Sequence, residues 1–362
     1  MSTLESKFDI FQSSLDSLQS TINNILIQNK NILLILSQIN INTLKITHHS
    51  FSINSLRLLI QSKNIHTPWS IIELTDNRIA TGGGDGSITI SSLNYIKRTW
   101  SLDIHHLNAH NEGIQCLCEI TKDKLASSSK DKSIKIWKVL STSLIHLDTL
   151  IGHNDSILKI ISHVNNDIII SCSKDKSIKI WKHNNNENYN KYQFISSLQE
   201  TNQIASIIQL TNNNDILICP GSNRSLSFWN INTYIKEHSI HNVWTSCSNG
   251  LIEFSKKDII LVMDEPTLYI IDSVLRVVIN KITDEISFMK TNYISSICLM
   301  DDTSMMYVCN GKICQLRLSD YKVTFTKEMK GDCRGEAIIT TNKGKYIIIN
   351  NSYYGFTVFE NE

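Results

Sequence analysis

The sequence predicts an all-β fold built from repeated four-stranded units, with a helical segment before them. Two stretches, residues 110–138 and 153–182, are nearly the same sequence. Weaker units continue on both sides at steps of 41 to 49 residues, while the first 46 residues show a heptad spacing of apolar side chains. A period in the low forties, with four short strands in each unit, is typical of the blades of a β-propeller.

Each unit is predicted to contain four strands. Three short runs rich in β-branched and aromatic residues follow the start of every unit, for example residues 69–74, 78–83 and 87–92 in the first. A fourth run lies in the spacer before the next unit. The seven units begin at His66, His110, His153, Thr201, Asn242, Thr291 and Asp332. We therefore expect a seven-bladed β-propeller preceded by a long N-terminal α-helix, a coiled coil.

The two ends of the repeat region predict how the ring closes. The seventh unit ends at residues 359–362 and lacks an outer strand of its own. An open ring would leave an unpaired strand edge, which natural folds avoid. Leu56 to Asn64 has the length and composition of the spacer strands, so we expect it to complete the last blade. The expected organisation is a helix over residues 1–47, a linker over 48–55 and a propeller over 56–362.

The two strong repeats share polar residues at equal spacing. Each begins with His, carries a Ser-x-Ser-x-Asp-x-Ser turn and ends in Ile-x-Ile-Trp. This pattern resembles the WD-repeat family, in which the first His bonds a Ser or Thr of the second strand and the Asp of the turn, while the Ser also bonds the Trp. The resemblance implies two sets of residues that lock their blades, namely His110, Ser127, Asp131 and Trp137, and His153, Ser171, Asp175 and Trp181.

The other units match this pattern less well. The first keeps Thr81 and Asp85 but has Ser91 where Trp is expected. The fourth keeps Trp229 but has Cys219 at the Ser position. The last three units are assigned from their spacing and strand periodicity alone.

The apolar seam of the first 46 residues predicts a coiled-coil helix. Core positions recur at alternating steps of three and four. A single Asn at an a position costs stability and specifies register, most often in a parallel dimer, so we expect self-association. A helix folded against its own propeller and a helical hairpin are the alternatives, because further apolar residues widen the stripe. The a positions are Phe8, Leu15, Ile22, Asn29 and Leu36.

Charge and composition narrow the class of protein. The formal net charge of the 362 residues is +1, which gives no reason to expect a nucleic-acid partner. We find no secretory leader and no apolar run long enough to cross a bilayer. The nine cysteines are odd in number and mostly lie within predicted strands, which favours buried thiols over a disulfide framework. We expect a cytoplasmic protein, or a nuclear one, without membrane insertion.

No catalytic, cofactor or metal site is predicted. The glycine-rich stretch from Thr81 to Ser87 lacks the helix and Lys of a phosphate-binding loop, and it falls where the strong repeats have a turn. Cys116 and Cys118 lack the second pair that a zinc site needs. We expect a non-catalytic scaffold for protein–protein interactions. A component of a cytoskeletal or vesicle-coat assembly is an alternative, and an enzyme with a site in the central channel is a weaker one.

A partner surface is predicted at the turns of the two strong repeats. Two lysines flank the turn Asp in each of them. Because neighbouring blades present equivalent turns on one face, these ammonium groups should lie together and attract an acidic or phosphorylated protein or peptide. Ordinary solvated lysines are the alternative. The residues are Lys130, Lys132, Lys174 and Lys176.

Overall fold

The computed structural model describes most of the repeat region. The described residues are 56–61, 67–94, 96–97, 99–163, 168–184, 191–211, 213–221, 224–243, 250–254, 259–264, 267–282, 294–300, 303–309, 312–320, 322–328, 338–340, 346–351 and 355–361. All of them belong to one compact unit, Ile53–Glu362. The predicted helix over 1–47, its a positions (Phe8, Leu15, Ile22, Asn29 and Leu36) and the linker over 48–55 lie outside the described residues.

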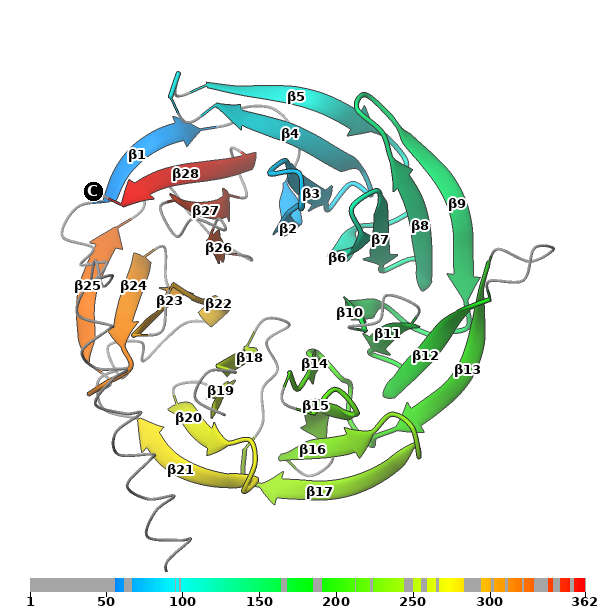
Figure 1. Ribbon diagram of the computed structural model, residues 1–362, viewed down its shortest axis with the longest axis vertical. Helices are drawn as coiled ribbons and strands as arrows, with labels where there is room; N and C mark the ends of the chain where they lie inside the picture. Colours follow the sequence, from blue (N-terminus) through cyan, green and yellow to red (C-terminus); the bar gives the residue numbers. More distant parts are fainter. Residues whose placement is uncertain are drawn as a thin grey trace, which may run out of the picture. The chain divides into compact units, whose positions relative to one another are not determined.

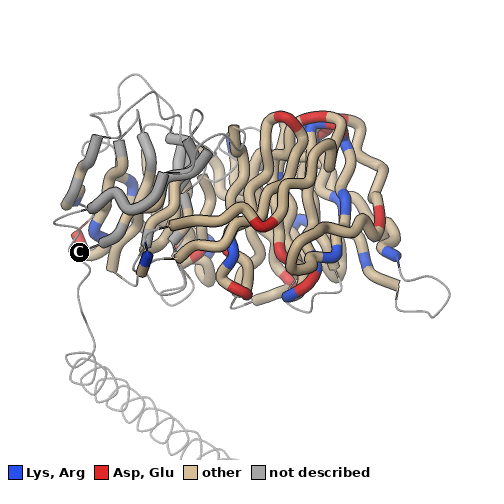
Figure 2. Tube along the Cα trace, turned by 90° about the horizontal axis from the view of Figure 1, so that it is seen from above, with Lys and Arg blue, Asp and Glu red and all other residues tan. Residues whose placement is uncertain are grey.

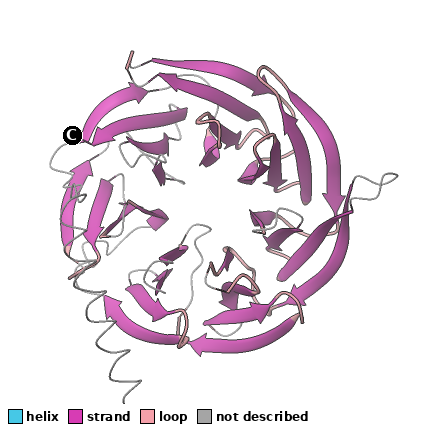
Figure 3. Cartoon of the chain, in the orientation of Figure 1, coloured by secondary structure: helices cyan, strands magenta, loops and turns pink. Residues whose placement is uncertain are grey.

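The fold is an all-β propeller. The described strands form four-stranded antiparallel sheets, seven in number, which follow one another around a ring (Figures 1 and 3). In each sheet the first strand in the sequence is the innermost, except in the last sheet, which takes β1 as its outer strand. In the described part of the chain no helix is long and apolar enough to cross a membrane.

The sheets made by the first half of the repeat region contain the two strong repeats. The first sheet has β2 (Pro68–Glu73), β3 (Ile79–Gly83), β4 (Ile88–Asn94) and β5 (Thr99–His106). The second has β6 (Ile114–Thr121), β7 (Lys124–Ser129), β8 (Ser133–Val139) and β9 (Leu144–Ile151). The third has β10 (Ile157–Ser162), β11 (Ile168–Ser173), β12 (Ser177–Asn184) and β13 (Lys191–Gln199). The fourth has β14 (Ile208–Gln209), β15 (Ile216–Gly221), β16 (Ser225–Asn230) and β17 (Ile235–His241).

The remaining sheets come from the weaker units. The fifth has β18 (Leu251–Phe254), β19 (Ile259–Asp264), β20 (Thr267–Asp272) and β21 (Val277–Ile282). The sixth has β22 (Ile294–Leu299), β23 (Ser304–Cys309), β24 (Lys312–Arg317) and β25 (Val323–Glu328). The last has β26 (Ile338–Thr340), β27 (Tyr346–Asn351), β28 (Gly355–Asn361) and β1 (Leu56–Gln61). Their strands therefore lie where spacing and periodicity place them.

The two ends of the repeat region meet in the last sheet. β1 pairs antiparallel with β28, with Leu56 opposite Asn361 and Gln61 opposite Thr357 (Figure 1). β1 thus supplies the outer strand of this sheet, and it ends at Gln61, whereas the sequence places the end at Asn64. Residues 62–64 lie outside the described part of the chain. Without β1 the outer edge of β28 would be unpaired.

Each sheet buries its apolar side chains against the next sheet. In one cluster Ile88 and Ile90 of β4 pack with Leu117 of β6 and Leu125 of β7. Equivalent clusters lie between the later pairs of neighbouring sheets. A further cluster joins Ile71 and Ile79 of the first sheet to Ile348 and Val358 of the last. Side-chain packing therefore also runs across the junction between the ends of the chain.

A β-bulge recurs between the third and fourth strands of the sheets. The register shifts next to Trp137 and Trp181 in the strong repeats, and at the equivalent Ser91, Trp229 and Ile271. A bulge adds one residue to one strand and increases the local twist. The outer strand can therefore curve around the ring.

The antiparallel order gives the ring two different faces. The turns between second and third strands, such as residues 130–132, share one face with the loops that carry His110 and His153. We call this the histidine face. The opposite face carries the turns between first and second strands and between third and fourth strands, such as residues 122–123 and 140–143.

Candidate functional site

The second sheet contains a hydrogen-bonded set of four residues, which we call a tetrad. His110 Nδ1 lies 2.9 Å from Asp131 Oδ2, and His110 Nε2 lies 2.7 Å from Ser127 Oγ. Trp137 Nε1 donates to the same Ser127 Oγ at 2.8 Å. The His, Ser and Trp are all buried. The tetrad links the loop before β6, strand β7, the turn after it and strand β8.

The third sheet repeats this geometry. His153 Nδ1 lies 2.7 Å from Asp175 Oδ2, and His153 Nε2 lies 2.8 Å from Ser171 Oγ. Trp181 Nε1 donates to Ser171 Oγ at 2.9 Å. The structure therefore brings together all eight residues that the family resemblance implies, in two matching tetrads. A buried polar group that loses its partner costs about 1–3 kcal/mol, so each tetrad stabilises its blade as a unit.

The carboxylate of each tetrad is held in its charged form. Burial would raise the pKa of Asp131, but hydrogen bonds from His110 and Ser133 outweigh burial and hold this pKa well below its usual range. Asp175 behaves in the same way, because His153 and Ser177 donate to it. A carboxylate whose pKa is lower in the folded state than in the unfolded state contributes stability above the unfolded pKa of about 4, and this contribution is lost as the pH falls.

This sign predicts a specific acid sensitivity. In urea denaturation, the free energy of unfolding of the natural chain should fall between about pH 5 and pH 2. An Asp131→Asn, Asp175→Asn variant should be less stable at pH 7 by about 1–3 kcal/mol for each site and should lose less stability on acidification. Asp123→Asn, at an exposed turn on the opposite face, is the control and should follow the natural chain. Equal acid sensitivity of the tetrad variant would contradict the assignment.

The fourth sheet uses a glutamate where the strong repeats use His and Ser. Trp229 Nε1 donates to Glu200 Oε1 at 3.0 Å, and Lys236 Nζ forms an ion pair with the same oxygen at 2.6 Å. Cys219, at the Ser position, is buried. Glu200 N donates to Lys176 O just as His110 N donates to Gly86 O. The fourth unit therefore begins at Glu200 and not at Thr201.

The sequence contains a signal for Glu200 that the search for a His-like residue misses. Glu200 stands four residues before the buried Ile204, as His110 stands four residues before Ile114. A carboxylate accepts a hydrogen bond from an indole N–H directly, so no intermediate Ser is needed.

The first sheet has a different arrangement. Thr81 Oγ1 and Thr89 Oγ1 share a hydrogen bond of 2.6 Å, and Asp85 Oδ1 accepts from Ser87. Ser91 Oγ, at the Trp position, is among the buried polar atoms that have no hydrogen-bond partner in the described part of the chain. The glycine-rich stretch forms the end of β3 and the following turn, as predicted, with Gly86 at φ 79°.

The four predicted lysines lie on the histidine face, in the turns after β7 and β11. Lys132 and Lys176 adopt positive φ values of 70° and 71°, the position that Gly86 takes in the first sheet. Lys132, Lys174 and Lys176 are exposed.

Lys130 differs from the other three lysines because it lies over an aromatic ring. Its Nζ is 4.0 Å from the centroid of the Trp69 ring. Trp69 comes from the innermost strand of the first sheet and lies against Gly84 and Gly113, where a Cβ on either glycine would come within 3 Å of the ring. Sequence reasoning missed Trp69, because nothing in its own repeat predicts a contact with the neighbouring blade.

Acidic residues share this face with the lysines. Glu112 and Asp155 are exposed in the loops that begin the second and third units. Figure 2 shows basic and acidic positions mixed along the ring. The surface is therefore a mixed pattern of charges with four closely spaced lysines.

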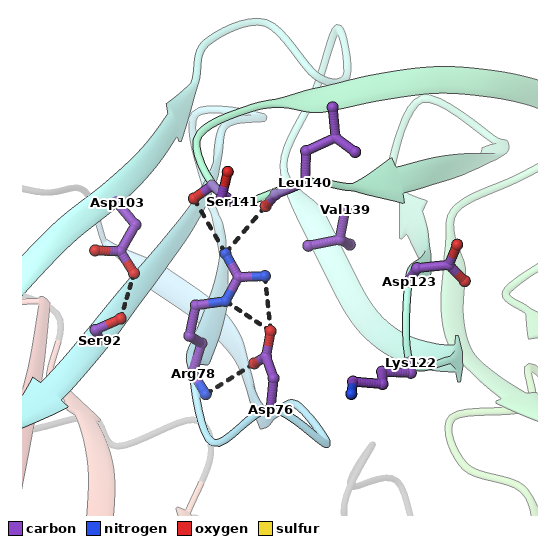
Figure 4. A pocket seen from close by; sticks show the side chains of 9 residues that line it. All are labelled: Asp76, Arg78, Ser92, Asp103, Lys122, Asp123, Val139, Leu140 and Ser141. Atoms are coloured by element: carbon purple, nitrogen blue, oxygen red, sulfur yellow. Dashed lines mark hydrogen bonds and ion pairs between the residues drawn. The ribbon is translucent and has the colours of Figure 1, made fainter.

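A cavity of about 650 Å³ lies on the opposite face between the first two sheets (Figure 4). Arg78 spans it: its guanidinium bonds Asp76 and donates to the carbonyls of Leu140 and Ser141. Asp103 accepts from Ser92 and Ser101. These polar groups bond each other, so we interpret them as a link between blades.

Six cysteines in the described part of the chain are free thiols. Burial raises the pKa of the Cys118 and Cys298 thiols to about 12 and raises the pKa of Cys116 as well. A thiol with a raised pKa is a weak nucleophile at neutral pH. We therefore assign these side chains to packing.

Comparisons with known proteins agree with this geometry. The family described as WD40, WD domain, G-beta repeat matches residues 102–138 and 145–182. No curated protein matches the sequence. Among solved structures, the WD40 β-propeller domain of Doa1 is similar, with a TM-score of 0.67 and 15% sequence identity over 85% of this chain and 97% of that one. The chain contains WD40 repeats within a β-propeller fold.

Proposed function

We propose that this protein is a non-catalytic scaffold that binds other proteins or peptides on the histidine face of a closed seven-bladed ring. Domains of the WD40 propeller type typically act as scaffolds for protein interactions. The observation that carries the proposal is the pair of matching tetrads in adjacent sheets. They hold two equivalent loops and turns rigidly next to each other, so the side chains on those turns are preorganised for binding.

The binding surface is the group of turns that carries Lys130, Lys132, Lys174 and Lys176. Three of these ammonium groups are exposed, and Lys130 is held over Trp69. An acidic or phosphorylated segment that contacts all four could also contact the indole ring. Such binding should weaken at high salt, because exposed charges are screened.

The test is a charge reversal on the histidine face. A Lys132→Glu, Lys174→Glu, Lys176→Glu variant leaves the Lys130–Trp69 contact in place. The matched control reverses Lys122, Lys138 and Lys182, which are also exposed. Proteins captured at low salt by the natural chain and by the control should be lost from the first variant, with all three folded by circular dichroism. Capture of the same proteins by the first variant would contradict the proposed surface.

We further propose that the N-terminal segment multiplies this binding surface by self-association. The support is the apolar seam with Phe8, Leu15, Ile22, Asn29 and Leu36 at its a positions. Light scattering tests it, because a chain that begins at residue 53 should be monomeric while the full chain is a dimer. We place the protein in the cytoplasm or nucleus, since free thiols are the usual state of cysteine there.

A further inference from the structure

A second cavity lies inside the ring, away from the lysines of the histidine face. Its volume is about 500 Å³, within the range of small-molecule sites. Residues of β10, β14, β18 and β22, or next to them, line it, and these are innermost strands of four successive sheets (Figure 1). Its apolar lining includes Ile161, Ile207, Leu251, Ile252 and Ile297.

The basic residue in the lining is Lys159 of β10. The equivalent position holds a small neutral residue in the neighbouring sheets, namely Ser70, Cys116 and Ser206. The near-identical second and third repeats therefore differ here by a positive charge inside the ring. Lys159 Nζ donates to Ser206 Oγ at 3.4 Å, a long hydrogen bond.

The surroundings of the Lys159 amino group do not offset its loss of hydration. Burial lowers its pKa, and thiolates of Cys116, Cys172 and Cys118 would raise it. However, burial raises the pKa of all three thiols, that of Cys118 to about 12. They are therefore neutral near pH 7 and supply no negative charge.

The acidic residue that lines this cavity is already engaged. Both carboxylate oxygens of Glu253 accept from Thr211 N, at 3.1 and 3.0 Å. Glu119 accepts from Thr75 N in the same way between the first two sheets, at 3.1 and 2.9 Å. This pairing therefore recurs as a structural link between neighbouring blades.

We propose that this channel cavity binds a small amphipathic carboxylate, with the carboxylate on Lys159 and the apolar body against the isoleucines and Leu251. An apolar pocket with one charged group that orients the ligand is the usual design of a small-molecule site. The anion would supply the negative charge that the three thiols do not. The inference is independent of protein binding on the histidine face.

The experiment uses the full chain and three probes with the same eight-carbon tail: octanoate, 1-octanol and octyltrimethylammonium. Isothermal titration calorimetry should show saturable 1:1 binding of octanoate, about ten-fold tighter than that of octanol, because a charged hydrogen bond adds about this much affinity. Octyltrimethylammonium should bind weakest. Octanol binding as tightly as octanoate, or absence of saturable octanoate binding, would overturn the proposal.

Lys159→Met removes the charge and keeps the length of the side chain. It should lower the affinity for octanoate about ten-fold and leave that for octanol unchanged. Lys182→Met, at an exposed position of β12, is the matched control and should bind octanoate like the natural chain. Unchanged octanoate binding by a folded Lys159→Met chain would place the ligand elsewhere. If that variant does not fold, the comparison of head groups on the natural chain still decides.

Discussion

Deletion of residues 1–64 is expected to make the propeller insoluble, whereas deletion of residues 1–52 leaves it folded. The longer deletion removes β1 (Leu56–Gln61), which supplies the outer strand of the last sheet. The edge of β28 then loses its partner, and an exposed, unpaired strand edge pairs with other chains. The shorter deletion ends at the boundary of the compact unit that begins at Ile53.

The measurement is the soluble fraction after expression, followed by size-exclusion chromatography and circular dichroism. The chain beginning at residue 53 is the control, because it differs from the other by twelve residues. A synthetic peptide with the sequence of residues 53–64, added during refolding, should restore solubility to the longer deletion. Equal solubility of the two truncated chains without the peptide would show that β1 is not needed to close the ring.

Much of the strand pattern could be predicted because the repeat is periodic in chemistry as well as in length. Ser127, Asp131 and Trp137 recur in the next unit as Ser171, Asp175 and Trp181, and each triplet needs its neighbours to satisfy its hydrogen bonds. Such a network leaves a full sequence signature. Position alone also predicts β1, since the last unit lacks an outer strand of its own.

Contacts between blades could not be predicted in this way. The position of Trp69 over Gly113 and under Lys130 depends on the distance between neighbouring sheets, which no repeat contains. The bulge beside Trp137 also leaves no composition signal, because any residue can occupy the extra position. Glu200 was missed for a different reason: a carboxylate replaces two residues of the tetrad, so the sequence pattern disappears while the role remains.

Replacement of Trp137 by Ala is expected to lower the free energy of unfolding by about 3–5 kcal/mol. The side chain is 2% exposed and belongs to the core between the first two sheets. Its ring packs edge-on against His106 and His146, with centroids 5.0 and 5.3 Å away. Truncation leaves a cavity in this core, and it also removes the indole N–H from Ser127, so part of the tetrad loses a partner.

Two further variants separate packing from hydrogen bonding. Trp137→Phe keeps much of the apolar volume but removes the N–H donor, so it should cost less, about 1–3 kcal/mol. Lys138→Ala, at the next and exposed position of β8, is the control and should change stability by less than about 0.5 kcal/mol. Urea denaturation of the four chains gives the comparison. The first sheet already has Ser91 at this position, so a loss below about 1 kcal/mol for Trp137→Ala would show that the second sheet tolerates the same change. The tetrad would then be dispensable for the stability of its blade.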